Sequence, residues 1–145
     1  MKRLIYVLPL LLALASGCLK DDGNYSYNLP APAPSGTFSG EFRRVSSNAD
    51  HSIVTIKTNI KVIIGPAANY SVQGDTTIIH AGSKGSYTIN GDRIKFEDST
   101  LSKTGTPTKT HLDGEYLFVY NGSIFQMKKN VGDTLNLQYD LKRTD

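Results

Sequence analysis

The alternation of apolar and polar side chains in residues 53–64 constrains the fold of this chain more than any other feature. In the stretch IVTIKTNIKVII, one face carries Val54, Ile56, Ile60, Val62 and Ile64, and the other carries Thr55, Lys57, Asn59 and Lys61. A period of two residues indicates an antiparallel strand that is buried on one side. Because twelve residues are many for one strand, either the strand bends, as in barrels, or Thr58 and Asn59 form a tight turn.

Two further segments alternate in the same way around an Asn-Gly pair, which indicates β-hairpins. In YTINGDRIKF, Asn90 and Gly91 supply the pair that a two-residue type I′ turn requires. The resulting register places Tyr87 opposite Ile94. The segment YLFVYNGSIFQM repeats the pattern at Asn121-Gly122.

The rest of the chain after Gly36 contains further strands and almost no helical periodicity. The segment TLNLQYDLK directs Leu135, Leu137, Tyr139 and Leu141 to one side, and weaker strands are expected at Thr37–Arg44 and Thr76–His80. Because no helix can cover them, the strands must bury their apolar faces against one another. We therefore predict an all-β fold, a single antiparallel meander barrel of about eight strands, with a two-sheet β-sandwich as the alternative.

The beginning of the chain has the pattern of a secretory signal peptide. Lys2 and Arg3 precede the apolar run Leu4–Ala15, and small residues follow it. This run is too short to cross the roughly 30 Å apolar core of a bilayer as a helix. We expect residues 1–17 to be the signal peptide, residues 18–35 a proline-rich tether, and residues 36–145 one β-domain.

The residues around Cys18 resemble two bacterial targeting motifs. The segment Ala15-Ser16-Gly17-Cys18 resembles a lipobox, which implies cleavage before Cys18 and acylation, with palmitate as an expected chain, at this cysteine. Two acyl chains are enough for stable anchoring. Lys20, Asp21 and Asp22 resemble the export signal of surface lipoproteins of the Bacteroidetes. Together these resemblances imply an outer-membrane lipoprotein that faces the cell surface, with a periplasm-facing protein as the alternative.

A second resemblance concerns the two ends of the β-domain. Gly36-Thr37-Phe38 and Arg143 are similar to the Gly-x-Trp motif and the late basic residue of lipocalin-like (calycin) barrels. The resemblance implies that the basic side chain closes over the aromatic ring at the base of the barrel. The chain departs from that family in having no tryptophan.

Composition and motifs argue against several classes of function. The formal charge of +3 includes Lys2 and Arg3, so the mature chain is nearly neutral and has no basic stripe that would bind nucleic acid. His51, His80 and His111 are scattered, which predicts no metal site. No Gly-x-Ser-x-Gly elbow and no phosphate-binding loop are present. We therefore predict a protein that is not an enzyme and has no cofactor.

Binding is the function that remains, and one hairpin carries the candidate residues. The candidate ligand-binding residues are Tyr116, Phe118, Tyr120, Phe125 and Met127, which share one face, whereas Leu117, Val119 and Ile124 share the other. Our leading hypothesis is a monomer that holds a small apolar or amphipathic ligand inside a lipocalin-like barrel. The alternative is a solid-core domain that binds an envelope protein or a glycan through its outer surface.

Two other features bear on the surface of the domain. Three segments resemble the O-glycosylation motif of the Bacteroidetes, which implies glycans at Thr76, Ser99 and Thr134. Residues Ser99–Thr110 have almost no apolar content and form either a binding loop or a solvated connection.

Overall fold

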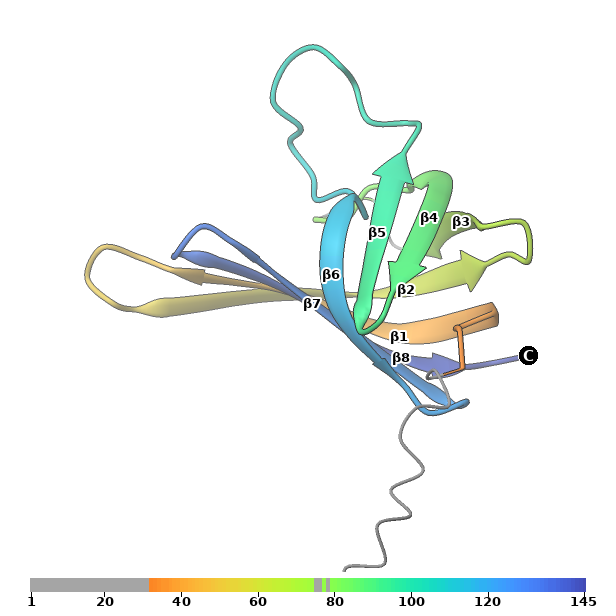
Figure 1. Ribbon diagram of the computed structural model, residues 1–145. Coiled ribbons are helices and arrows are strands. Elements are labelled where there is room, and N and C mark those ends of the chain that lie inside the picture. The colour runs from red at the N-terminus through yellow and green to blue at the C-terminus, as the bar shows by residue number, and fades with distance from the viewer. Residues whose placement is uncertain (1–31, 75–76, 78) are drawn as a thin grey trace, which may run out of the picture.

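The computed structural model describes residues 32–74, 77 and 79–145, and these residues form strands, turns and loops (Figure 1). The strands are β1 (Gly36–Ser47), β2 (Ile53–Ile64), β3 (Asn69–Gly74), β4 (Lys84–Asn90), β5 (Arg93–Asp98), β6 (Gly114–Tyr120), β7 (Ile124–Val131) and β8 (Leu135–Arg143). Each strand pairs antiparallel with the next, and β8 pairs with β1, which closes the sheet into a barrel. The predicted antiparallel meander barrel is therefore confirmed in preference to the sandwich.

Residues 53–64 form one continuous strand, as the first of the two alternatives for this segment required. β2 pairs with β1 along its full length, from Ile53 opposite Ser47 to Ile64 opposite Gly36. Thr58 and Asn59 lie inside this ladder, so they form no turn. The alternation in the sequence therefore marks a single strand that runs from the barrel wall to a free end.

The first Asn-Gly hairpin forms with a register that differs from the expected one. Tyr87 lies opposite Phe96 and not opposite Ile94, so the two loop residues are Gly91 and Asp92. Gly91 has a φ of 60°, and it is the loop residue in the left-handed region. Because the error is two residues, every side chain keeps the predicted face of the sheet.

The second Asn-Gly hairpin has a longer loop than the expected two residues. Tyr120 pairs with Phe125, and residues 121–123 connect β6 to β7. The Asn121 side-chain oxygen Oδ1 accepts hydrogen bonds from the backbone N–H groups of Ser123 and Ile124, at 3.1 and 2.8 Å. The asparagine thus shapes the turn through its side chain.

The expected strand Thr76–His80 is wrong for the residues described within it. Thr77 and Ile79 lie in a turn, and His80 makes an isolated parallel bridge with Thr110. The third strand is instead β3, in which Tyr70 and Val72 point into the core. This short segment alternates over only a few residues, which is why its signal in the sequence is weak.

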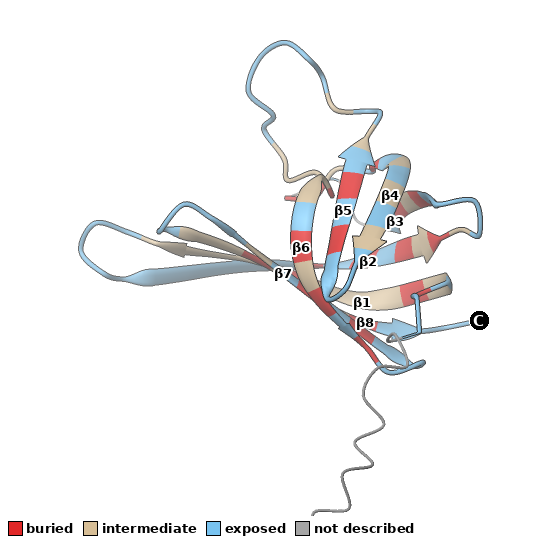
Figure 2. Ribbon diagram, viewed as in Figure 1, coloured by how far each residue is buried: buried red, intermediate tan, exposed pale blue. Residues whose placement is uncertain are grey.

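Apolar side chains from all eight strands form one core. Along strands such as β5, buried residues alternate with exposed ones (red and pale blue in Figure 2). The buried aromatic residues are Phe38, Phe42, Tyr70, Phe96, Tyr116, Phe118, Tyr120, Phe125 and Tyr139. Many of their rings meet edge to face, such as Tyr70 and Phe96 with centroids 4.8 Å apart at 71°. This geometry is the preferred one for aromatic pairs and contributes beyond the area buried.

The hairpins β1–β2 and β7–β8 extend beyond the barrel wall (Figure 1). β3 pairs with β2 only from Ile60 onward, and β6 pairs with β7 only up to Lys128. We call the extension the projecting sheet, defined as residues 43–47, 53–57, 129–131 and 135–138. Its strand order is β2-β1-β8-β7, with β2 and β7 at the two edges.

Candidate functional site

The five candidate ligand-binding residues lie together on the inner face of the β6–β7 hairpin, within the core. Tyr116, Phe118, Tyr120, Phe125 and Met127 have exposed fractions between 0 and 7%. The ring of Phe125 packs against the rings of Phe118 and Tyr120, with centroids 6.0 and 6.1 Å apart. The sequence correctly placed these side chains on one face, and the structure packs them against one another.

The opposite face of the same hairpin carries an apolar depression that is open to solvent. We call it the outer groove; its volume is about 430 Å³, and it is lined by Asp92, Leu117, Phe118, Val119, Gln126, Met127 and Lys128. Val119 is 68% exposed, so most of this aliphatic side chain is in contact with solvent. The groove has an aliphatic floor and a polar rim that includes one carboxylate and one ammonium group.

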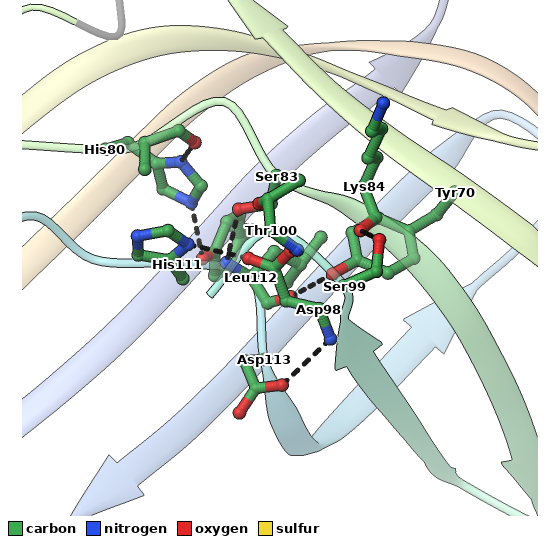
Figure 3. A network of polar contacts seen from close by, with 12 residues as sticks. Tyr70, His80, Ser83, Lys84, Asp98, Ser99, Thr100, His111, Leu112 and Asp113 are labelled. Carbon is green, nitrogen blue, oxygen red and sulfur yellow. Dashed lines mark hydrogen bonds and ion pairs between the residues drawn. The ribbon is translucent and has the colours of Figure 1, made fainter. Parts of the chain in front are cut away.

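A polar network lies at the end of the barrel where the chain leaves β5 (Figure 3). The buried carboxylate of Asp98 accepts hydrogen bonds from the backbone N–H and the hydroxyl of Thr100, at 2.7 and 2.6 Å. Its other oxygen lies 2.6 Å from Nδ1 of His111. Burial alone would raise the pKa of Asp98, but the hydrogen bonds from Thr100 and His111 outweigh it and lower the pKa.

The same network holds the far end of the loop against the core. The backbone N–H of Leu112 donates to the Ser83 hydroxyl at 3.1 Å, and the Tyr70 hydroxyl donates to the Leu112 carbonyl at 2.5 Å. Asp113 accepts a hydrogen bond from the backbone N–H of Asp98 at 3.0 Å. The loop Ser99–Thr110 is thus fastened at both ends by side chains that the sequence analysis did not select.

His80 occupies a buried position next to this network. Its Nδ1 lies 2.6 Å from the Ala81 carbonyl, and its Nε2 lies 2.9 Å from the Tyr139 hydroxyl. A carbonyl only accepts, so Nδ1 carries the proton and Nε2 accepts from Tyr139 in the neutral ring. Burial lowers the pKa of His80 to about 4. Burial also raises the pKa of Tyr139 well above its usual range, so both groups are neutral.

The contacts of this network are those of a structural role, because they hold the loop to the barrel. His111 and Asp98 form a pair, and their hydrogen bonds fix the loop to the barrel end. In the part of the chain that the structure describes, no three His, Cys, Asp or Glu side chains gather as a metal site. A shallow depression of about 320 Å³ under the loop is lined by hydroxyl-bearing residues, among them Thr100, Ser102 and Thr104, together with His111.

The two residues that carry the lipocalin-like resemblance are direct neighbours. Phe38 of β1 lies opposite Arg143 of β8 in the seam that closes the barrel. The guanidinium of Arg143 donates to Asp145 at 2.8 Å and to the Tyr120 hydroxyl at 3.3 Å. The Phe38 ring meets Tyr120 edge to face at 5.7 Å, so this tyrosine links the two residues.

The remaining predicted sites divide into two groups. Cys18, Lys20, Asp21, Asp22 and Thr76 lie outside the described residues. Ser99 and Thr134 are exposed in turns, as glycosylation would require, and the Ser99 hydroxyl donates to the Lys84 carbonyl at 2.8 Å. Glycans at these positions stay a prediction.

Comparison of the chain with protein-family models, with curated proteins and with solved structures finds no match. Among residues 32–74, 77 and 79–145, no helix is long and apolar enough to cross a membrane.

Proposed function

We propose that this chain is a lipid-anchored binding protein of the cell surface that recognises an envelope protein through the outer surface of its barrel. The observation that carries the proposal is the contrast between the two faces of the β6–β7 hairpin. The inner face is packed into the core, whereas Val119 on the outer face stands exposed in the outer groove.

The inner face gives little support to an interior carrier. Tyr116, Phe118 and Phe125 are buried against other side chains of the barrel, so they already have partners without a ligand. Their role in stability explains their apolar character fully. This packing favours the outer-surface hypothesis over the hypothesis of a ligand inside the barrel.

The outer groove has the features of a contact surface. Leu117 and Val119 supply apolar area whose removal from water would favour association, at roughly 25 cal/mol per Å². Asp92 and Lys128 at the rim supply charges of both signs for orientation. An aliphatic floor without an exposed aromatic ring suits the side chains of a protein better than the face of a sugar, so we favour a protein over a glycan.

The anchor is supported by the sequence around Cys18. Acylation there, followed by the alternating prolines Pro30, Pro32 and Pro34, would hold the barrel away from the membrane on an extended tether. The substitution Cys18→Ala tests this part of the proposal. Loss of palmitate labelling and release of the protein from membranes are expected, and unchanged labelling would contradict the anchor.

The groove is tested by a photoactivatable cross-linking residue, p-benzoyl-phenylalanine, placed at position 119 in intact cells. We expect an adduct with one envelope protein at position 119 and none at Thr88, an exposed position of β4 that serves as the control. Adding Leu117→Asp to the chain that carries the cross-linking residue should abolish the adduct, because binding would bury a charge on the apolar floor. Equal labelling at positions 119 and 88 would contradict the proposal.

Two further measurements separate the alternatives. The first is binding of the full chain to an array of bacterial polysaccharides. Binding that is lost in Val119→Asp would show that the partner is a glycan and not a protein. Organic extraction of the protein purified from its host, followed by mass spectrometry, tests the interior carrier. A stoichiometric small apolar molecule would overturn the assignment of the core as purely structural.

A further inference from the structure

We propose that two copies of this chain associate through the free edge of β2, as an antiparallel strand pair centred on Thr55. This interface goes beyond the proposed function and shares no residue with the outer groove. It replaces the expectation of a monomer. It rests on the pairing pattern, the direction of the backbone groups and the side chains of residues 53–57.

The outer half of β2 has a partner on one side only. β1 pairs with all of β2, but β3 begins to pair with it at Ile60, opposite Gly74. No other described strand lies along residues 53–57, and all five of these residues are exposed. A free edge of this length presents a row of backbone donors and acceptors to any strand that can align with it.

The hydrogen bonds at the hairpin end show which residues of β2 face outward. The Asn48 N–H donates to the Ser52 carbonyl at 2.9 Å, whereas the Ser47 N–H points the other way, to Thr134 of the β7–β8 turn. Since the β1–β2 register is uninterrupted, the backbone groups of Val54 and Ile56 bond to β1. The backbone N–H and C=O groups of the even-numbered residues of outer β2 are therefore already hydrogen-bonded to β1.

The odd-numbered residues of outer β2 point away from β1. At the other end of the same strand, the Gly65 N–H donates to Asn69 at the start of β3, which confirms that odd positions face the second neighbour. Ile53, Thr55 and Lys57 consequently direct their backbone N–H and C=O groups to the free edge. A second copy satisfies these groups only where its own odd-numbered residues lie opposite them.

Among the registers that set odd residues opposite odd residues, the one centred on Thr55 pairs all three outward-facing residues of the free segment with one another. It places Thr55 opposite its own copy and Ile53 opposite Lys57 of the second copy, which gives about six backbone hydrogen bonds. A register centred on Lys57 would set two ammonium groups opposite each other, which is unfavourable. A register centred on Ile53 would move the overlap into the loop that carries Asp50.

The Thr55 register also matches exposed apolar side chains with each other. It pairs Val54 of one copy with Ile56 of the other, twice by symmetry, and these side chains are 43% and 41% exposed in the single chain. Such β-branched pairs stabilise neighbouring strands. The apolar face of the projecting sheet would then continue across the symmetry axis from one copy to the next.

The occupant is a second copy because the edge is complementary to itself. A neutral hydroxyl lies at the centre, apolar residues lie on either side, and the one charge meets an apolar residue and not its like. The opposite edge of the projecting sheet is shorter, residues 129–131, and Lys129 there donates to the Asp113 carbonyl at 2.8 Å. Association through β2 therefore closes at two copies, as a two-fold dimer.

Disulfide trapping in the full chain tests the register. Cys18 is the only cysteine, so Cys18→Ala leaves an introduced thiol as the only one. We expect Thr55→Cys to form a disulfide-linked dimer under mild oxidation, since Cα atoms of a hydrogen-bonded pair lie about 5.5 Å apart. The matched control Lys57→Cys should not cross-link, because its two copies would lie about 14 Å apart along the strands.

Sedimentation of the full chain with and without edge substitutions tests the association itself. Thr55→Pro removes the outward N–H without removing a bond to β1, whereas Thr55→Val keeps that N–H. We expect a concentration-dependent dimer in the parent protein and in Thr55→Val, and a monomer with an unchanged circular dichroism spectrum in Thr55→Pro.

A parent protein that stays monomeric up to about 1 mM, or equal cross-linking of Thr55→Cys and Lys57→Cys, would overturn the proposal; 1 mM corresponds to a very weak association of about 4 kcal/mol. In that event the edge would be open to a strand of another protein. The outer-groove cross-linking at position 119 is independent of this result, so failure of one proposal is distinguishable from failure of the other.

Discussion

The imidazole Nε2 of His80 accepts a hydrogen bond from the hydroxyl of Tyr139 over 2.9 Å, at a place that solvent does not reach. The two residues are far apart in sequence, and the closed barrel brings them together. The ring of Phe42 covers the histidine edge to face at 4.8 Å. The pair ties the segment after β3 to β8, and burial at this place lowers the pKa of His80.

Stability should fall as the pH falls through the range in which His80 titrates. The pKa of His80 is about 4 in the folded protein and near 6.5 in the unfolded chain, because burial disfavours the charged ring. Below about pH 6.5 the unfolded state binds a proton that the folded state refuses. The free energy of unfolding should therefore decrease between about pH 6.5 and 4, by on the order of 3 kcal/mol in total.

Urea unfolding of the parent protein and of His80→Gln at pH 7.5, 5.5 and 4.5 measures this effect. The pH dependence should be weaker in His80→Gln and unchanged in the control His51→Gln, since His51 is exposed. Parallel curves for the parent and for His80→Gln would show that the buried ring does not cause the loss.

Tyr139→Phe should destabilise the barrel by about 1–3 kcal/mol at neutral pH. It removes the donor to Nε2 of His80 and leaves that nitrogen buried without a partner. Tyr120→Phe is the comparison, because the Tyr120 hydroxyl is only partly buried and should cost less. Thermal unfolding by circular dichroism ranks the two; a larger loss in Tyr120→Phe would speak against a strong His80–Tyr139 bond.

Asp98→Asn should loosen the loop Ser99–Thr110 without unfolding the barrel. The substitution weakens the charge-assisted hydrogen bonds to Thr100 and His111, each worth about 1.5–3 kcal/mol. Opening of the loop, and with it tryptic cleavage at the exposed Lys103, should become about tenfold or more faster. Trypsin should cleave the control Asp92→Asn at the rate of the parent protein. If Asp98→Asn were also cleaved at the parent rate, Asp98 would not hold the loop.

The pKa of Asp98 adds a pH dependence of the same loop. Because its folded pKa is lowered, the contribution of Asp98 is present above the unfolded pKa of about 4 and is lost as the pH falls through the folded pKa. Proteolysis of the loop by pepsin, which works at acid pH, should therefore accelerate as the pH decreases below about 4, and much less so in Asp98→Asn.

Phe125→Ala and Val119→Ser should differ sharply in their effect on stability. Phe125 is buried in the barrel interior, so truncation should cost about 3–5 kcal/mol. Val119 is exposed on the outer face, so its substitution should change the free energy of unfolding by about 0.5 kcal/mol or less. Urea titration of both variants gives the comparison. Similar losses would mean that the core does not lie where the structure places it.

Gly40→Ala tests the seam that closes the barrel. A Cβ at Gly40 would overlap the backbone carbonyl oxygen of Asp140 in β8, the strand that pairs with β1. Separation of the two backbones should cost about 1–3 kcal/mol. Ser39→Ala, the next position of the same strand, should be nearly neutral. A neutral Gly40→Ala would indicate that the two strands are not in this close register.

The alternation of side chains predicted most of the strands and the face that each residue occupies. It succeeded for β2 and β8 because successive side chains of a strand point to opposite faces, so a half-buried strand alternates between apolar and polar residues. It failed for β3, which alternates too briefly, and for Thr76–His80, where the apolar Ile79 is buried from a turn. The alternation also did not predict the register of the Asn-Gly hairpins, because turn geometry depends on hydrogen bonds to side chains such as that of Asn121.

The sequence by itself determined that this chain forms an antiparallel β-domain, that its apolar faces turn inward and that its first residues resemble a lipoprotein signal. Only the tertiary structure decided which apolar residues are covered. Ile56 and Ile60 share one face of β2, yet they are 41% and 3% exposed. The reason is physical: period and composition record the face of a strand, but burial also requires a neighbouring strand, and β3 reaches Ile60 and stops there.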